Sequence, residues 1–320
     1  MAERSDDCYN TRMNKVYDVV IIGAGPAGYT AAIYTARASL STLMIAGDTP
    51  GGQLLLTGEV ENFPGFKDGI TGPALMDEMK AQAKRFGTEI ISEFVTKVEF
   101  DGAVKKVYVG EEVYQARTVI ISTGASANWL GLENEQRLMS HGISACATCD
   151  AFFFRDKEVV VVGGGDVAME EAHALTKFAS KVYIVHRRDT LRASKIMQQR
   201  AMNDPKVEFI WNAEVVDVLG KDSVEGVRLR DTKDGSERDF ACQGMFVAIG
   251  HTPATKLFAE ALTLDEKGYL VTTDLVKTEL AGVFAAGDVV DAHYRQAITA
   301  AGDGCRAALE AERYLVDLED

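Results

Sequence analysis

Tyr17-Asp18-Val19-Val20-Ile21-Ile22-Gly23-Ala24-Gly25-Pro26-Ala27-Gly28 is the segment that decides the fold. Its apolar, largely β-branched first half is typical of a strand buried in a parallel sheet. An Ala-rich stretch compatible with a helix follows from Tyr29 to Ala38, and Thr42–Ile45 has the pattern of a second strand. A lone G-x-G-x-x-G motif is weak evidence, but inside a strand–turn–helix–strand unit it predicts a dinucleotide-binding site.

The same plan occurs a second time in the chain. A strand pattern covers Lys157–Val162, and the glycine-rich turn Gly163-Gly164-Gly165-Asp166-Val167-Ala168 follows it directly. A helical pattern then extends to Phe178, and Lys181–Val185 reads as the next strand. A repeat of this length and order predicts a second nucleotide-binding domain of similar design.

Three later segments each read as a strand that ends at glycine. Val119–Gly124 follows the first fingerprint, Phe246–Gly250 follows the second, and Gly282–Asp288 lies near the C-terminus. A long helical pattern, Arg295–Leu315, comes after the third, although two glycines interrupt it. Because no third fingerprint precedes this last strand, we expect it to complete the first domain.

The sequence therefore predicts an α/β protein with two Rossmann-like dinucleotide-binding domains, the second inserted into the first. The connections are expected near the glycines that end the closing strands, where Pro253 suits a linker. The predicted organisation is a flexible tail at 1–14, a first domain at 15–125 and 254–320, and an inserted domain at 126–253.

Bulk properties exclude several classes of function. The chain has 320 residues, enough for about two domains of ordinary size. Its net charge of -14 repels nucleic-acid phosphates. No apolar run approaches the ~20 residues that span a bilayer, and the polar N-terminus lacks the apolar core of a secretory signal. We expect a cytoplasmic protein that binds neither nucleic acid nor membrane.

The second domain carries a basic turn at the tip of its second strand, His186-Arg187-Arg188-Asp189, with Arg192 beyond it. Arginine at this offset from a fingerprint accommodates the 2′-phosphate of NADPH, because guanidinium groups match phosphate oxygens. The alternative is a solvated basic turn without a ligand. The candidate NADPH-binding residues are Gly163, Gly165, Asp166, His186, Arg187, Arg188 and Arg192.

The nucleotide of the first domain is not identified by its own strand tip, which has no acid at its end. Other features favour FAD: Gly51-Gly52-Gln53 offers a flexible backbone, and Asp288 offers a carboxylate to a ribityl hydroxyl. The start of the long helix would stabilise negative charge on a reduced flavin. For Asp288 the alternative is a simple turn acid or helix cap. The candidate FAD-binding residues are Gly23, Gly25, Pro26, Ala27, Gly28, Gly51, Gly52, Gln53, Asn62, Thr123, Gly124, Gly287, Asp288, Arg295, Gln296 and Ala297.

Cys146-Ala147-Thr148-Cys149-Asp150 lies between the two fingerprints. Two cysteines at this spacing can close a disulfide ring or open to a dithiol, so the pair is a candidate two-electron store. A zinc half-site and an inert buried pair are the alternatives. No second CxxC exists and the histidines are scattered, so we expect no metal. Cys8, Cys242 and Cys305 are isolated, and their roles stay open.

Taken together, the paired fingerprints, the Cys146–Asp150 motif, His186–Asp189, Gly287-Asp288 and Tyr294-Arg295-Gln296-Ala297 resemble the bacterial-type, low-molecular-weight NADPH–thioredoxin reductase family. The resemblance covers nearly the whole chain from about Tyr17. It implies a homodimer in which electrons pass from NADPH through FAD and a redox disulfide to the disulfide of thioredoxin. It also implies an inserted NADPH domain that rotates between two positions.

The resemblance gives the redox residues separate roles. It implies that Cys149 is the sulfur next to the flavin, and we expect Cys146 to attack the disulfide of thioredoxin. Asp150 is a candidate general acid–base, or alternatively a helix N-terminal acid that favours the dipole. Competing functions are a related flavoprotein disulfide reductase or dithiol oxidase with another partner, and a nucleotide-binding redox sensor without turnover.

Overall fold

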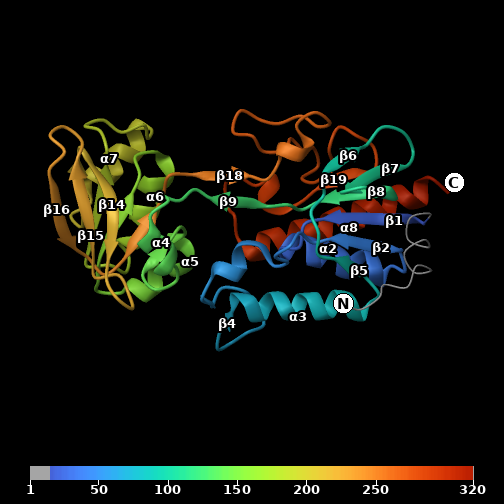
Figure 1. Ribbon diagram of the computed structural model, residues 1–320, viewed down its shortest axis with the longest axis horizontal. Helices are drawn as coiled ribbons and strands as arrows, with labels where there is room; N and C mark the ends of the chain where they lie inside the picture. The colour runs from blue at the N-terminus through green and yellow to red at the C-terminus, as the bar shows by residue number, and fades with distance from the viewer. Residues whose placement is uncertain (1–14, 320) are drawn as a thin grey trace. The chain divides into compact units, whose positions relative to one another are not determined.

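The computed structural model describes residues 15–319, which form two compact units (Figure 1). The first unit combines the chain up to Ser126 with the chain from Pro253 onward, and the second unit is Ala127–Thr252. The second unit is thus an insertion in the first. The tail expected at 1–14, with Cys8, lies outside the described residues.

The first unit is built on a parallel sheet that continues into an antiparallel extension. Strands β5, β2, β1 and β8 are neighbours in that order and parallel, and β19 adds to β8 in the same direction. The first half of β8 instead pairs with the antiparallel β7, which pairs with β6. The strands are β1 (Val16–Ile22), β2 (Thr42–Ile45), β5 (Glu89–Ile91), β6 (Lys97–Glu99), β7 (Lys105–Val109), β8 (Glu112–Ile121) and β19 (Val283–Ala285).

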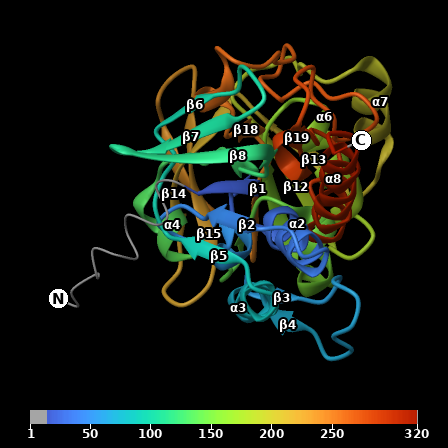
Figure 2. The same cartoon turned by 90° about the vertical axis from the view of Figure 1, so that its right-hand side faces the viewer.

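Helices cover one face of this sheet, and α2 and α8 lie side by side there (Figure 2). Their contact is rich in alanine, including Ala31, Ala307 and Ala308, so the helix backbones come close together. The other face packs on a second apolar cluster that contains Phe100 and Phe258. The remaining elements are α2 (Pro26–Arg37), η1 (Gly52–Leu56), β3 (Glu59–Val60), β4 (Ile70–Thr71), α3 (Gly72–Arg85), η3 (Lys256–Phe258), η4 (Gly287–Val289) and α8 (Ala297–Asp317).

The long C-terminal helix α8 does not break at its glycines, because it runs from Ala297 to Asp317. A Cβ atom on Gly304 would lie 2.0 Å from the carbonyl oxygen of Ala27, whereas one on Gly302 would meet nothing within 4 Å. Gly304 therefore lets α8 approach the first turn of α2, a packing role that its position in an apolar helical pattern did not reveal.

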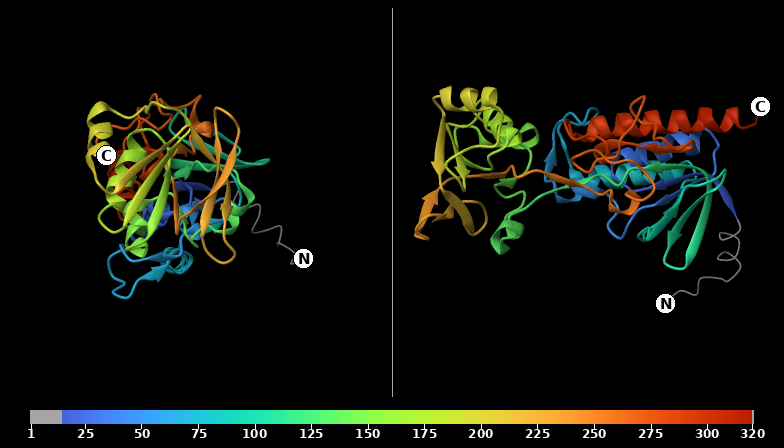
Figure 3. Two further views of the ribbon diagram at one scale, coloured as in Figure 1. Left: turned by 90° about the vertical axis from the view of Figure 1, so that its left-hand side faces the viewer. Right: turned by 90° about the horizontal axis from the view of Figure 1, so that it is seen from above.

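The second unit has a parallel sheet with the strand order β10-β17-β11-β12-β13. A separate antiparallel sheet, β14-β15-β16, lies next to it and is drawn in gold to orange in Figure 3. The strands are β10 (Ile143–Ser144), β11 (Glu158–Val162), β12 (Lys181–His186), β13 (Val207–Trp211), β14 (Ala213–Leu219), β15 (Gly226–Asp231), β16 (Glu237–Ala241) and β17 (Met245–Val247). The helices are α4 (Glu133–Arg137), α5 (Ala147–Asp150), η2 (Ala151–Phe154), α6 (Asp166–Leu175) and α7 (Lys195–Asn203).

The two connections between the units pair with each other. β9 (Ala125–Ala127) and β18 (His251–Pro253) form a two-stranded sheet. The amide of Ala254 donates to Gly124 O at 2.9 Å, and Gly124 adopts a left-handed backbone, with φ of 71°, that suits glycine. Both passages of the chain therefore run through one short ribbon.

Candidate active site

The first fingerprint forms a backbone cradle at the end of β1. A Cβ on Gly23 would lie 2.3 Å from Ser122 O, and one on Gly28 would lie 2.1 Å from Gly23 O, so only glycine fits either position. Gly25, by contrast, faces open space and caps α2 without a side-chain hydrogen bond. The first amide groups of α2 are thus available to an anion such as a pyrophosphate.

Two other predicted segments lie against this cradle. A Cβ on Gly52 would be 3.7 Å from the Cα of Gly25, and one on Gly287 would be 2.9 Å from the Cβ of Ala27. Two further candidate residues contact each other, since Asn62 Nδ2 donates to Gln296 Oε1 at 3.4 Å. The fold therefore gathers residues from two distant parts of the sequence around one fingerprint.

The Thr123-Gly124 pair has a different local role. Thr123 Oγ1 donates to Ala254 O at 2.9 Å, and the carbonyl of Gly124 accepts the amide of the same residue. These two candidate cofactor residues are thus engaged with the chain that returns from the second unit.

Asp288 is a strongly perturbed carboxyl group of the first unit. Burial raises its pKa to about 7, the negative charge of Asp291 adds to the shift, and the guanidinium of Arg295 opposes it. Arg295 itself has a left-handed backbone, with φ of 49°. Its amide donates to Asp291 Oδ2 at 3.1 Å, which fixes the turn before α8. A protonated Asp288 can donate a hydrogen bond as well as accept one.

The second fingerprint repeats the cradle at the end of β11. A Cβ on Gly163 would lie 2.4 Å from Ala248 O, while Gly165 faces open space and caps α6 without a side-chain hydrogen bond. The side chain of Asp166 is exposed, and its Oδ1 accepts the amide of Ser194 at 2.7 Å. The predicted nucleotide residue Asp166 thus anchors the segment before α7.

His186 packs between the fingerprint and the basic turn. Its ring lies against Gly164, where a Cβ would be 2.2 Å from the imidazole, and Nε2 is 3.0 Å from Thr190 O. Burial lowers the pKa of His186, and the positive charges of the neighbouring arginines lower it further against the opposing effect of the Thr190 bond. The amide of Arg192 donates to Gly164 O at 2.8 Å, so the basic turn is tied to the fingerprint.

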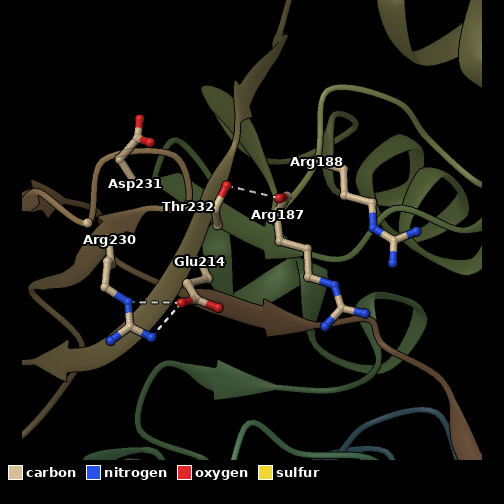
Figure 4. A pocket seen from close by; sticks show the side chains of 7 residues that line it. Arg187, Arg188, Glu214, Arg230, Asp231 and Thr232 are labelled. Carbon is tan, nitrogen blue, oxygen red and sulfur yellow. Dashed lines mark hydrogen bonds and ion pairs between the residues drawn. The ribbon is translucent and has the colours of Figure 1, made fainter.

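Arg187 and Arg188 line a polar cavity of about 530 Å³ (Figure 4). Strand β15 supplies Arg230 on its opposite side, and the close-up shows this guanidinium paired with Glu214. The Arg230 Nε–Glu214 Oε1 distance is 2.9 Å. The full lining is Arg187, Arg188, Glu214, Arg230, Asp231, Thr232 and Gly235.

A ring of hydrogen bonds holds the two arginines of this turn. Asn212 donates its amide to Arg188 O at 3.4 Å and accepts the amide of Thr232 at 2.7 Å. The hydroxyl of Thr232 donates to the carbonyl oxygen of Arg187 at 3.2 Å. The sequence reasoning missed Arg230, Glu214 and Thr232, because nothing in the local pattern relates the end of β15 to the tip of β12.

Cys146 and Cys149 form a disulfide at the start of the short helix α5, with their Cα atoms 5.3 Å apart. Cys146 is the N-terminal capping residue, and its sulfur lies 3.2 Å from the amide of Cys149. Its own amide donates to Ser144 Oγ at 3.0 Å. Cys146 is half-buried and Cys149 is exposed. The pair is thus built into a turn in which the amide of Cys149 faces the sulfur of Cys146.

Asp150 directly follows the disulfide. Burial raises the pKa of its carboxyl, and a hydrogen bond with Ser144 opposes the shift. A carboxyl whose pKa moves upward toward neutrality can hold a proton next to the cysteines.

The other described cysteines lie apart from this turn. Burial raises the pKa of the Cys242 thiol to about 12, so that thiol is inert near neutral pH. Cys305 is half-buried on α8. Within residues 15–319, no three His, Cys, Asp or Glu side chains gather as metal ligands would. Over the same range no helix is both long and apolar enough to cross a bilayer.

Comparisons with known proteins identify the family to which this chain belongs. The family model of pyridine nucleotide-disulphide oxidoreductases matches residues 17–304. Thioredoxin reductase from Streptomyces clavuligerus is 57% identical over 311 residues, which cover 96% of this chain and 97% of that protein. The corresponding values for thioredoxin reductase from Mycolicibacterium smegmatis are 54% over 303 residues, 94% and 97%.

Solved structures agree. The crystal structure of thioredoxin reductase from Streptococcus pyogenes superposes with a TM-score of 0.92 at 44% identity, covering 95% of this chain and 99% of that one. The predicted α/β class with Rossmann-like domains is confirmed. The chain therefore belongs to the pyridine nucleotide-disulphide oxidoreductases and, among them, to the thioredoxin reductase family.

Proposed function

We propose that this protein is an NADPH-dependent thioredoxin-disulfide reductase. Electrons pass from NADPH through FAD and the Cys146–Cys149 pair to the disulfide of thioredoxin. The observation that carries the proposal is the redox disulfide at the N-terminus of α5, in the same unit as a dinucleotide fingerprint. The relatives named thioredoxin reductase, which match along almost the whole chain, support the same activity.

The second unit is the proposed NADPH-binding domain. The open face of Gly165 and the uncapped start of α6 suit a pyrophosphate. Arg187 and Arg188 are exposed in a cavity and held by their carbonyl groups, which leaves their guanidinium groups to bind the 2′-phosphate. His186 then serves as the support of this turn.

The first unit is the proposed FAD-binding domain, and its residues fit that cofactor. The Gly25 face and the start of α2 would hold the pyrophosphate, and Gly52 and Gly287 bring their loops to the same cradle. Asp288 would bind a ribityl hydroxyl with its buried carboxyl. Bound flavin supplies the two-electron exchange between a dihydronicotinamide and a disulfide.

The chain's own chemistry is thiol–disulfide exchange. In the reduced enzyme, the Cys146 thiolate attacks one sulfur of thioredoxin, and the other sulfur leaves as a thiolate that takes a proton. Cys149 then attacks Cys146 Sγ, which re-forms the enzyme disulfide and releases thioredoxin as a dithiol. Two electrons thus leave the cysteine pair and reduce thioredoxin. Asp150, whose pKa burial raises, would supply and recover the proton.

NADPH oxidation coupled to a bacterial thioredoxin tests the proposal. We expect NADPH consumption that depends on thioredoxin and matches the thioredoxin thiols formed. The control is a thioredoxin whose two active-site cysteines are replaced by serine, which should support none. Thioredoxin-independent consumption of NADPH with oxygen as the acceptor would instead indicate a dithiol or NADPH oxidase. The homodimer and the cytoplasmic location stay predictions.

A further inference from the structure

A carboxylate from outside the CxxC motif contacts its backbone. Glu171 lies on α6, and its Oε2 accepts a hydrogen bond from the amide of Ala147, the residue directly after Cys146. Glu171 is half-buried, whereas its neighbour Glu170 is exposed on the same helix. The contact therefore sets Glu171 apart from an otherwise similar acid one position earlier.

The position of this carboxylate matters because the Cys146 sulfur caps the first turn of α5, where it accepts a backbone amide. Such amides stabilise a thiolate, and one of them, that of Cys149, lies 3.2 Å from Cys146 Sγ. The amide of Ala147 belongs to the same first turn, but it donates to Glu171 instead. Two carboxyl groups among the described residues are joined to this turn: Asp150 bonds to Ser144, and Glu171 accepts the amide of Ala147.

A negative charge beside Cys146 acts differently on the two redox forms. The disulfide is neutral, so the carboxylate costs it little. The reduced form contains a thiolate, and a nearby negative charge raises its free energy. A dithiol whose reduced form is destabilised gives up its electrons more readily, as an enzyme that reduces other proteins requires.

We propose that Glu171 is a positioning residue with two effects on the Cys146–Cys149 pair. Its hydrogen bond holds the Ala147 amide and so orders the turn, and its charge makes the dithiol a stronger reductant. The physiological meaning rests on the proposed reductase function, but both effects are properties of the cysteine pair itself.

The charge effect is measured as an equilibrium with dithiothreitol on the purified holoenzyme, without nucleotide or thioredoxin. At a pH where the thiolate is populated, two electrons and one proton from dithiothreitol open the Cys146–Cys149 bond to one thiol and one thiolate. The second proton passes to the buffer, and dithiothreitol becomes its cyclic disulfide. Acid quenching, alkylation and mass spectrometry of the peptide give the reduced fraction. We expect Glu171→Gln to shift this equilibrium toward the dithiol by about three- to tenfold, and the matched control Glu170→Gln to leave it within twofold.

The positioning effect is measured as deuterium uptake by the peptide that contains Cys146–Asp150. Glutamine can still accept the amide of Ala147, so Glu171→Gln should keep the wild-type protection. Glu171→Leu cannot, and we expect faster uptake there but not in the core strand β11. Faster uptake in both places would mean general unfolding and would contradict a local role.

Equal equilibria for wild type, Glu171→Gln and Glu170→Gln would overturn the charge effect. Unchanged uptake in Glu171→Leu would overturn the positioning effect. Neither measurement involves turnover. Both effects can therefore be measured even on a protein that fails to reduce thioredoxin. Failure of this inference and failure of the proposed function are therefore separate outcomes.

Discussion

At the scale of single residues, the basic turn of the second unit shows how far sequence reasoning reaches. The offset of Arg187 and Arg188 from the fingerprint predicted a phosphate site, and both side chains line a cavity. The opposite wall, with Arg230 and its partner Glu214, was not predicted. Only the folded sheet brings β15 to the tip of β12, so the local pattern contains no signal for it.

Replacing Arg187 and Arg188 together by alanine should weaken NADPH binding by about 100-fold or more. Each charge-assisted hydrogen bond to phosphate contributes roughly 1.5–3 kcal/mol, and NADH lacks the phosphate. Binding of both nucleotides by titration calorimetry checks this, with NADH affinity expected to change little. Arg200→Ala, an exposed arginine on α7 outside the cavity, is the control. An equal loss for NADH and NADPH would show that the phosphate site is elsewhere.

Asp288 gives the flavin-free protein a pH-dependent stability. Its pKa in the folded chain is about 7, above the value of an unfolded aspartate, so the folded state binds more protons between about pH 4 and pH 7. The free energy of unfolding should therefore fall by about 1–4 kcal/mol as the pH rises through this range. Asp288→Asn should remove this component, and urea unfolding of both proteins at pH 4.5 and pH 7.5 measures it. Parallel pH profiles for the two proteins would refute the shift.

At the scale of elements, hydrophobic patterns located the central strands and helices closely. β2 has the predicted bounds, and α2 and α6 start at the fingerprints. The antiparallel sheet β14–β16 was not predicted. Its strands contain no glycine fingerprint or cysteine motif to draw attention to this part of the chain. The glycines of α8 were read as interruptions, yet the helix is continuous. Their meaning depends on which surface each one faces, and the sequence alone does not tell that.

The two glycines of α8 should respond to alanine in opposite ways. Gly304→Ala places a Cβ 2.0 Å from the carbonyl oxygen of Ala27, so α8 must move away from α2, at a cost of roughly 2–4 kcal/mol. Gly302→Ala meets nothing within 4 Å and should stabilise the helix by roughly 0.5–1 kcal/mol. Thermal unfolding of the two variants compares them directly. A Gly304→Ala protein as stable as Gly302→Ala would contradict the close helix contact.

At the scale of the whole molecule, the chain passes twice through one ribbon, β9 with β18, between its two units. The insertion follows from the sequence, because the last strand has no fingerprint of its own and completes the first sheet. How the cysteine pair serves both a flavin and an outside protein does not follow from local patterns. We propose that the second unit turns about this ribbon.

The central claim is that electrons reach thioredoxin only through Cys146 and Cys149. Cys149→Ser tests it most directly, under anaerobic conditions with NADPH and thioredoxin. We predict that NADPH still bleaches the yellow flavin absorbance, while thioredoxin reduction falls by about a thousandfold or more. Cys305→Ser, which leaves the pair intact, should keep both activities. Thioredoxin reduction by Cys149→Ser at the wild-type rate would contradict the claim.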